Sequence, residues 1–68
     1  MTMIGETIRY LRNERGLTQA ALAKEIGVSQ KAIDYWERGV NEPVASNILS
    51  LAVFFNVTTD ELLGRKDL

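Results

Sequence analysis

The sequence predicts an all-α, five-helix domain, and three observations support this prediction. Apolar residues recur at helical spacing along the chain, and no segment shows the strict alternation of a half-buried strand. Four of the glycines, Gly16, Gly27, Gly39 and Gly64, interrupt this pattern at short intervals. The 68 residues suffice for one small core, so we expect residues 1–68 to form a single domain.

The first helix is expected over residues 2–15. Ile4, Ile8 and Leu11 fall at positions i, i+4 and i+7, which places them on one stripe of a helix. Gly16 follows and is a good helix stop, because glycine readily adopts the left-handed conformation that closes a helix. The stripe is therefore the face that we expect to point inward.

The second and third helices are expected over residues 18–26 and 29–38. Thr18 and Ser29 are good N-caps, because their hydroxyls can accept hydrogen bonds from free backbone N–H groups. Leu22 lies on the inward face of the second helix.

The connection between these two helices is very short, because only residues 27–29 separate them. Gly27 suits the end of the second helix and Gly39 the end of the third, since glycine accepts positive φ. So short a connection favours a sharp crossing of the two helices. We therefore predict a helix-turn-helix unit over residues 19–38.

The fourth helix is expected to begin near Val44, directly after Pro43. Its inward stripe consists of Ile48, Leu51, Ala52 and Phe55. A fifth helix of one or two turns is expected from Thr58, since Thr58 and Glu61 have capping-box spacing. Its apolar contacts are expected from Leu62 and Leu63.

The third helix separates its side chains into two faces when they are placed at about 100° per residue. The packing face consists of Ala32, Ile33 and Trp36. The polar face covers an arc of about 140° and consists of Gln30, Lys31, Asp34, Tyr35 and Arg38. We expect the core to contain Leu22, Ile33, Trp36 and Phe55, and this expectation does not depend on the function of the polar face.

Two interpretations of the polar face are open. From spacing alone, a polar face on a short helix is most often solvated surface. Its residue types also suit DNA, because glutamine can pair with adenine N6 and N7, and lysine can donate to guanine O6 and N7. Gln30 and Lys31 lie in the first turn, the part of a recognition helix that enters the major groove.

The composition excludes several kinds of function. The chain has no cysteine and no histidine, so zinc or copper sites lack their usual ligands and histidine catalysis is impossible. We expect a non-enzymatic protein without metal, cofactor or small-molecule ligand. No apolar run approaches the ~20 residues of a membrane span, and the N-terminus lacks a signal pattern. We therefore expect a cytoplasmic protein.

The charge balance gives no support to DNA binding by itself. Eight Lys and Arg residues against nine Asp and Glu residues give a net charge of −1, whereas nucleic-acid-binding domains are usually basic. The acidity is concentrated in residues 40–68.

An ordered series of short motifs runs through residues 4–64: GLTQ, LA, IGVSQ, WERG and FFNV. This series resembles the lambda-repressor-like helix-turn-helix family, the Cro and phage-repressor type of bacterial regulator. The resemblance implies five helices, with the second and third forming the DNA-binding unit. It also implies a transcriptional regulator, in particular a repressor that binds a double-stranded DNA operator of pseudo-palindromic sequence as a homodimer.

The resemblance implies roles for individual residues. Gln19 matches the family's phosphate-clamping glutamine, and Ser29 matches a capping position that often touches phosphate. The positions that reach base edges are matched by Gln30, Lys31 and Tyr35. Arg12 and Glu37 match an ion pair that ties the first helix to the recognition helix. Asp34 and Arg38 share the reading face and complete the expected set of DNA-binding residues.

Two departures from the family pattern keep a second hypothesis open. Glu42 stands in a stretch where members often carry basic residues that bind phosphate. Asp34 lies within the reading face, where it could accept from cytosine N4 or simply be tolerated at the edge. The second hypothesis is therefore a protein-interaction module of the same fold, such as an antitoxin-like or adaptor protein.

Three hydrophobic residues lie outside the inward stripe of the fourth helix, namely Leu49, Val53 and Phe54. An exposed apolar group there is a candidate dimer surface. For Phe54, ordinary packing against the first or fifth helix is the simpler interpretation.

Overall fold

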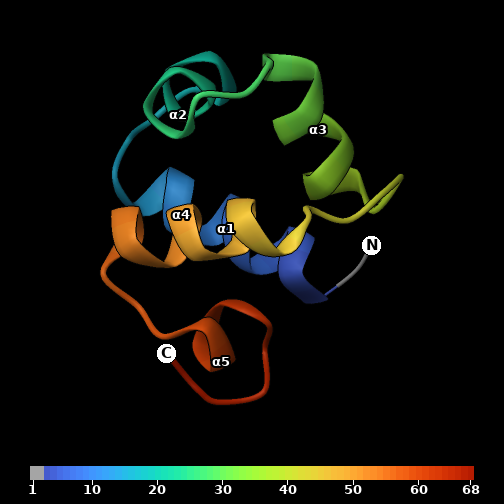
Figure 1. Cartoon of the computed structure of the whole chain (residues 1–68). Coiled ribbons are helices and arrows are strands. Elements are labelled where there is room, and N and C mark those ends of the chain that lie inside the picture. The colour runs from blue at the N-terminus through green and yellow to red at the C-terminus, as the bar shows by residue number, and fades with distance from the viewer. Residues whose placement is uncertain (1–2) are drawn as a thin grey trace.

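Five helices follow one another in the computed structural model, which describes residues 3–68 (Figure 1). They are α1 (Met3–Glu14), α2 (Gln19–Ile26), α3 (Gln30–Arg38), α4 (Ala45–Phe55) and α5 (Thr59–Leu62). The described part of the chain contains no strand, so the predicted all-α class is confirmed. Thr2, the expected first residue of the first helix, lies outside the described residues.

The predicted N-caps of α2 and α3 are confirmed. The Thr18 hydroxyl accepts a hydrogen bond from the backbone N–H of Ala21 at 3.0 Å. The Ser29 hydroxyl does the same for Ala32 at 3.1 Å. Gly27 lies between them with φ of +82°, which lets the chain leave α2 and enter α3 within three residues. These local contacts fix the corner at which the two helices meet.

The capping box that begins α5 is also present. The Thr58 hydroxyl accepts from the backbone N–H of Glu61 at 3.0 Å, and the Glu61 carboxylate accepts from the N–H of Thr58 at 2.8 Å. Leu62 is fully buried, whereas Leu63 is 36% exposed. Leu63 therefore contributes less apolar contact than expected, because a single helical turn directs only one of two consecutive leucines inward.

Figure 1 shows α1 and α4 in the middle of the molecule, with α2 and α3 on one side and α5 on the other. Helix α3 packs against α1 and α2, and α4 packs against α2 and α5. The core between the helices consists of Ile4, Ile8, Leu22, Ala23, Ile33, Trp36, Leu51, Ala52, Phe55 and Leu62. The four residues that the sequence places in the core are all 5% exposed or less.

The outer side of α4 presents two apolar side chains to solvent. Leu49 is 58% exposed and Val53 is 79% exposed. Phe54 is half-buried. Its ring lies edge-on to the ring of Phe55, with 5.1 Å between the two ring centroids. The guanidinium carbon of Arg15 lies 4.9 Å from the centroid of the Phe54 ring. Phe54 thus takes part in packing. None of the helices in residues 3–68 is both long and apolar enough to cross a membrane.

Candidate nucleic-acid interface

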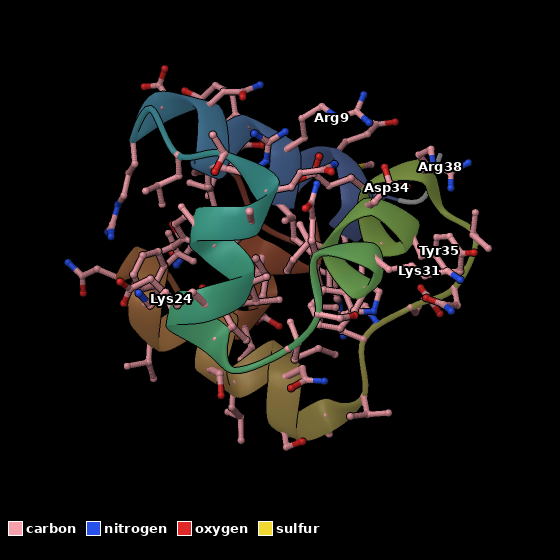
Figure 2. All side chains as sticks on the ribbon, turned by 90° about the horizontal axis from the view of Figure 1, so that it is seen from above. Arg9, Lys24, Lys31, Asp34, Tyr35 and Arg38 are labelled. Atoms are coloured by element: carbon pink, nitrogen blue, oxygen red, sulfur yellow. The ribbon has the colours of Figure 1, made fainter. Side chains whose placement is uncertain are left out.

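The two faces of α3 have different surroundings. Ile33 is fully buried and Trp36 is 5% exposed, so this face anchors the helix to the core. Gln30 and Lys31 are exposed in the first turn, directly after the cap. Figure 2 shows Lys31, Asp34, Tyr35 and Arg38 together on one side of the molecule. The polar face predicted from the sequence is therefore a continuous outer surface of α3.

Tyr35 lies between two cations of its own helix. The Lys31 Nζ and the Arg38 guanidinium carbon are each 5.4 Å from the centroid of the Tyr35 ring. A cation near an aromatic face is attracted by the ring quadrupole. These contacts limit the freedom of three side chains that the sequence assigns to DNA binding.

Asp34 is held by its neighbour on the next turn. The Arg38 Nε donates to the Asp34 Oδ2 at 3.0 Å, and Arg38 Nη2 lies 2.9 Å from the same oxygen. The hydrogen bond from Arg38 lowers the pKa of Asp34, with further lowering by a hydrogen bond from Gln19 and by the charges of Arg38 and Arg9. Asp34 therefore remains an anion whose charge Arg38 balances, which reduces its repulsion of a phosphate backbone.

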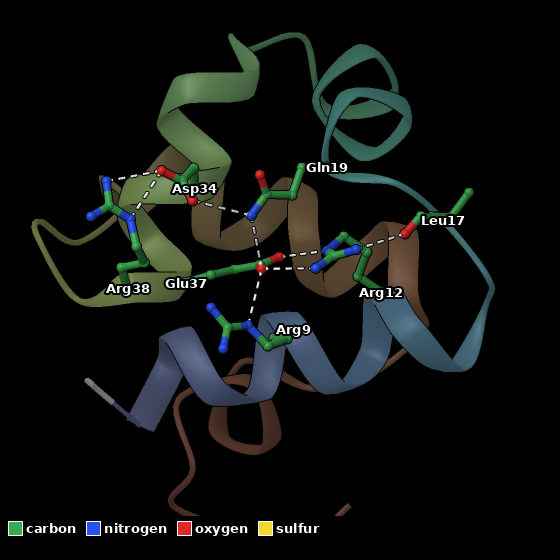
Figure 3. A network of polar contacts seen from close by, with 7 residues as sticks. All are labelled: Arg9, Arg12, Leu17, Gln19, Asp34, Glu37 and Arg38. Atoms are coloured by element: carbon green, nitrogen blue, oxygen red, sulfur yellow. Dashed lines mark hydrogen bonds and ion pairs between the residues drawn. The ribbon is translucent and has the colours of Figure 1, made fainter.

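A buried carboxylate, Glu37, joins α1, α2 and α3 (Figure 3). Arg12 donates to it through Nε at 2.6 Å and Nη2 at 3.0 Å, and through Nη1 to the Leu17 carbonyl at 2.8 Å. The Gln19 amide donates to Glu37 Oε1 at 3.2 Å, and the Arg9 Nε donates to the same oxygen at 3.3 Å. The structure thus places Arg12 and Glu37 in direct contact and adds two donors to the pair.

Both members of this pair keep their charges. Burial raises the pKa of Glu37, but hydrogen bonds from Arg12 and Gln19 and the charge of Arg12 outweigh burial, so the net pKa is lowered. The hydrogen bond to Glu37 raises the pKa of Arg12 against the opposing effect of burial. An ion pair of this kind fixes the orientation of α3 relative to α1 and α2.

The lowered pKa of Glu37 predicts a loss of stability in acid. The carboxylate contributes stability above its unfolded pKa of about 4.3, and that contribution is lost as the pH falls through the lower, folded pKa. We expect the melting temperature, followed by circular dichroism, to fall between pH 6 and pH 3.

The Glu37→Gln variant tests this prediction. It should have a lower melting temperature at neutral pH and a flatter dependence of the melting temperature on pH. Glu25→Gln, which removes an exposed carboxylate, is the matched control. A pH dependence that Glu37→Gln leaves unchanged would contradict this assignment.

Comparison with known proteins places this geometry in a family. A helix-turn-helix family model matches residues 8–62 of the chain. The chain belongs to the helix-turn-helix family. A relative named HTH-type transcriptional activator BcrR, from Enterococcus faecalis, is 40% identical over 63 residues, which are 93% of this chain and 31% of BcrR. Repressor protein C2 of Salmonella phage P22 is 43% identical over 61 residues, which are 90% of this chain and 28% of C2.

The P22 c2 repressor also provides a structural match. Its crystal structure in complex with synthetic operator 9T gives a TM-score of 0.88 at 39% identity, and the match covers 97% of this chain and 100% of that one. The lambda-repressor-like resemblance is therefore confirmed. These helix-turn-helix proteins are DNA-binding transcriptional regulators and not enzymes. The chain spans about a third of the length of the two curated relatives, so it corresponds to one part of each.

Two side chains of this helix-turn-helix domain have contacts that the sequence did not reveal. The Gln19 amide, expected against phosphate, instead donates to Glu37 and, at 3.4 Å, to Asp34. A phosphate contact by Gln19 stays a prediction. Arg9 was missed altogether, although its spacing of three residues from Arg12 puts both on one face of α1.

The segment after α3 in this helix-turn-helix domain begins at Gly39, which has φ of +75°. The N–H of Val40 donates to the Tyr35 carbonyl at 2.9 Å and closes the helix end. Glu42 is exposed and Pro43 is buried, so the chain turns back into the core directly after the acidic side chain. Glu42 thus follows the last residue of α3 by four positions on an exposed part of the chain.

Proposed function

We propose that this chain is the DNA-binding domain of a transcriptional repressor that acts as a homodimer on a pseudo-palindromic operator. The helix-turn-helix unit over residues 19–38 is the reading unit, and α3 enters the major groove with its first turn. The observation that carries the proposal is the outer face of α3, whose exposed Gln30 and Lys31 stand on a helix oriented by the buried Glu37. The c2 repressor structure with operator supports it, because that protein binds DNA with the same fold.

The homodimer follows from the small reach of one reading helix. A single α3 contacts only a few base pairs, and a two-fold dimer doubles the contacts on half-sites about one helical turn, roughly 34 Å, apart. The exposed Leu49 and Val53 on α4 are our candidates for the dimer surface. Ser29, Asp34 and Arg38 complete the proposed DNA interface, in which Ser29 is expected to touch phosphate. A regulator of this kind acts in the cytoplasm and needs no metal or cofactor.

Selection of bound sequences from a random duplex library at two salt concentrations tests the proposal. An enriched motif with two-fold symmetry would establish operator binding and dimerisation together. An enriched motif without symmetry would overturn the homodimer and leave DNA reading in place. No enrichment even at low salt would overturn DNA reading and favour a protein-interaction module instead. The exposed Glu42 and the apolar side chains of α4 are the observations that suit this second candidate.

Glu42→Lys is expected to tighten binding to the enriched duplex. The exposed carboxylate follows α3 by four residues, so we expect a lysine there to replace a repulsion of the backbone with a phosphate contact. Each added contact releases counterions, and the slope of log affinity against log salt should steepen by about 0.9. Titrations at several salt concentrations measure both effects. An unaltered slope would mean that residue 42 points away from the duplex.

A further inference from the structure

Arg9 lies on the same side of the molecule as the polar face of α3. Figure 2 shows Arg9 in the same part of the view as Asp34 and Arg38, whereas Lys24 projects from the other side. The Gln19 amide donates both to Asp34 and to the Glu37 oxygen that Arg9 also contacts, so Arg9 and Asp34 belong to one polar network. Helix α1 therefore reaches the edge of the proposed DNA interface through this residue.

The two arginines of α1 use their nitrogens differently. Arg12 donates from all three nitrogens, to Glu37 and to the Leu17 carbonyl, and only 14% of its side chain is exposed. Arg9 is anchored through Nε alone, and 42% of its side chain is exposed. Within residues 3–68 its Nη1 and Nη2 have no hydrogen-bond partner, and in Figure 3 both point away from Glu37. Arg9 thus offers two donors to an acceptor outside the domain.

The charges of the network in Figure 3 do not cancel. Arg12 balances Glu37, and Arg38 balances Asp34. The guanidinium of Arg9 is left as the excess positive charge of this cluster. A phosphate is the natural ligand for it, because the planar guanidinium fork matches phosphate oxygens with two parallel hydrogen bonds.

We propose that Arg9 binds a phosphate of the DNA backbone through Nη1 and Nη2, which makes α1 a third element of the interface beside α2 and α3. The inference rests on the proposed DNA-binding function. Arg9 and Gln19 donate to the same oxygen of Glu37, which links Arg9 on α1 to the first residue of α2. Because Glu37 already holds the Nε of Arg9, less side-chain freedom is lost when phosphate binds.

The test compares Arg9→Gln with Lys24→Gln, which removes the same charge from an exposed residue on the other side of the molecule. Affinities for the enriched duplex and for a scrambled duplex of the same composition are measured at several salt concentrations. We expect Arg9→Gln to weaken binding to both duplexes alike, roughly fivefold at 0.1 M salt, and to reduce the salt slope by about 0.9. Lys24→Gln should change neither quantity.

The outcomes separate this inference from the proposed function. If Arg9→Gln and Lys24→Gln have the same salt slope, the phosphate contact is overturned, while DNA binding by the parent chain still stands. An altered base preference would also overturn it, because a phosphate contact carries no sequence information. If the parent chain binds neither duplex, the proposed function fails and the role of Arg9 fails with it.

A second variant keeps the test valid if Arg9→Gln does not fold. Arg9→Lys retains the charge but loses the planar fork. It should keep most of the salt slope and lose part of the affinity. If Arg9→Lys reduces the salt slope by as much as is expected for Arg9→Gln, a phosphate contact that depends on the charge of residue 9 is contradicted.

Discussion

Replacing Arg12 with alanine is expected to lower the free energy of unfolding by about 3–5 kcal/mol, because it removes the main ion-pair partner of a buried carboxylate. Arg12 supplies the two shortest contacts of Glu37, at 2.6 and 3.0 Å. The side chain of Glu37 is fully buried, and without Arg12 only the longer hydrogen bonds from Gln19 and Arg9, at 3.2 and 3.3 Å, would remain. A domain of this size has a total stability of about 3–10 kcal/mol. The variant should therefore melt at a much lower temperature or be largely unfolded.

Urea denaturation measures this loss, with Arg38→Ala as the matched control. Arg38 also pairs with a carboxylate, but its side chain is 50% exposed and its partner Asp34 is 36% exposed. Pairs of this kind on a helix surface contribute only about 0.3–0.5 kcal/mol. If Arg12→Ala and Arg38→Ala lower the free energy of unfolding by the same small amount, Glu37 is not held by Arg12 in the way the geometry indicates.

A double variant separates the pair from the residues that surround it. Arg12→Met combined with Glu37→Leu removes both charges and keeps apolar volume, and such replacements of buried pairs are often neutral. We expect the double variant to be more stable than Arg12→Ala. Recovery of stability would identify the buried carboxylate without Arg12 as the source of the loss. The DNA affinity of the double variant, compared with that of the parent chain, would then show how much the polar network contributes to orienting α3.

The parts of the fold that were predictable from the sequence are those set by near neighbours. Thr18 and Ser29 mark helix starts because each cap bonds a backbone N–H only three residues ahead. The inward stripes follow from the 3.6-residue period, and the buried positions of Leu22 and Ile33 agree with it. Such signals do not depend on how the helices are arranged relative to one another.

The contacts that sequence reasoning missed join residues far apart in the chain. Arg9 and Glu37 are 28 positions apart, and Gln19 and Glu37 are 18 positions apart. Whether these side chains meet depends on how α1 and α2 cross α3, and no local pattern determines that crossing. The Asp34–Arg38 pair is different, because its i, i+4 spacing made it predictable. The sequence therefore predicted which side chains share the polar face of α3 better than it predicted the contacts among them.

Replacing Gln30 with alanine is expected to weaken binding to the enriched duplex by about 1–3 kcal/mol and to relax the preference at one or two base positions. Gln30 is exposed in the first turn of α3, and among the described residues its side chain has no hydrogen-bond partner. Its amide is therefore free to pair with adenine N6 and N7. Asp34 lacks this freedom, since Arg38 and Gln19 already occupy its oxygens.

Competition with duplexes that carry every substitution across one half-site measures this change in preference. Stability should stay within about 0.5 kcal/mol of the parent, because the cap of α3 joins Ser29 to Ala32 and does not involve Gln30. Gln19→Ala is the comparison, since the phosphate contact predicted for Gln19 carries no sequence information and its loss would weaken binding to all sequences alike. If Gln30→Ala behaves in that way too, Gln30 contacts the backbone, and the reading of bases falls to Lys31 and Tyr35.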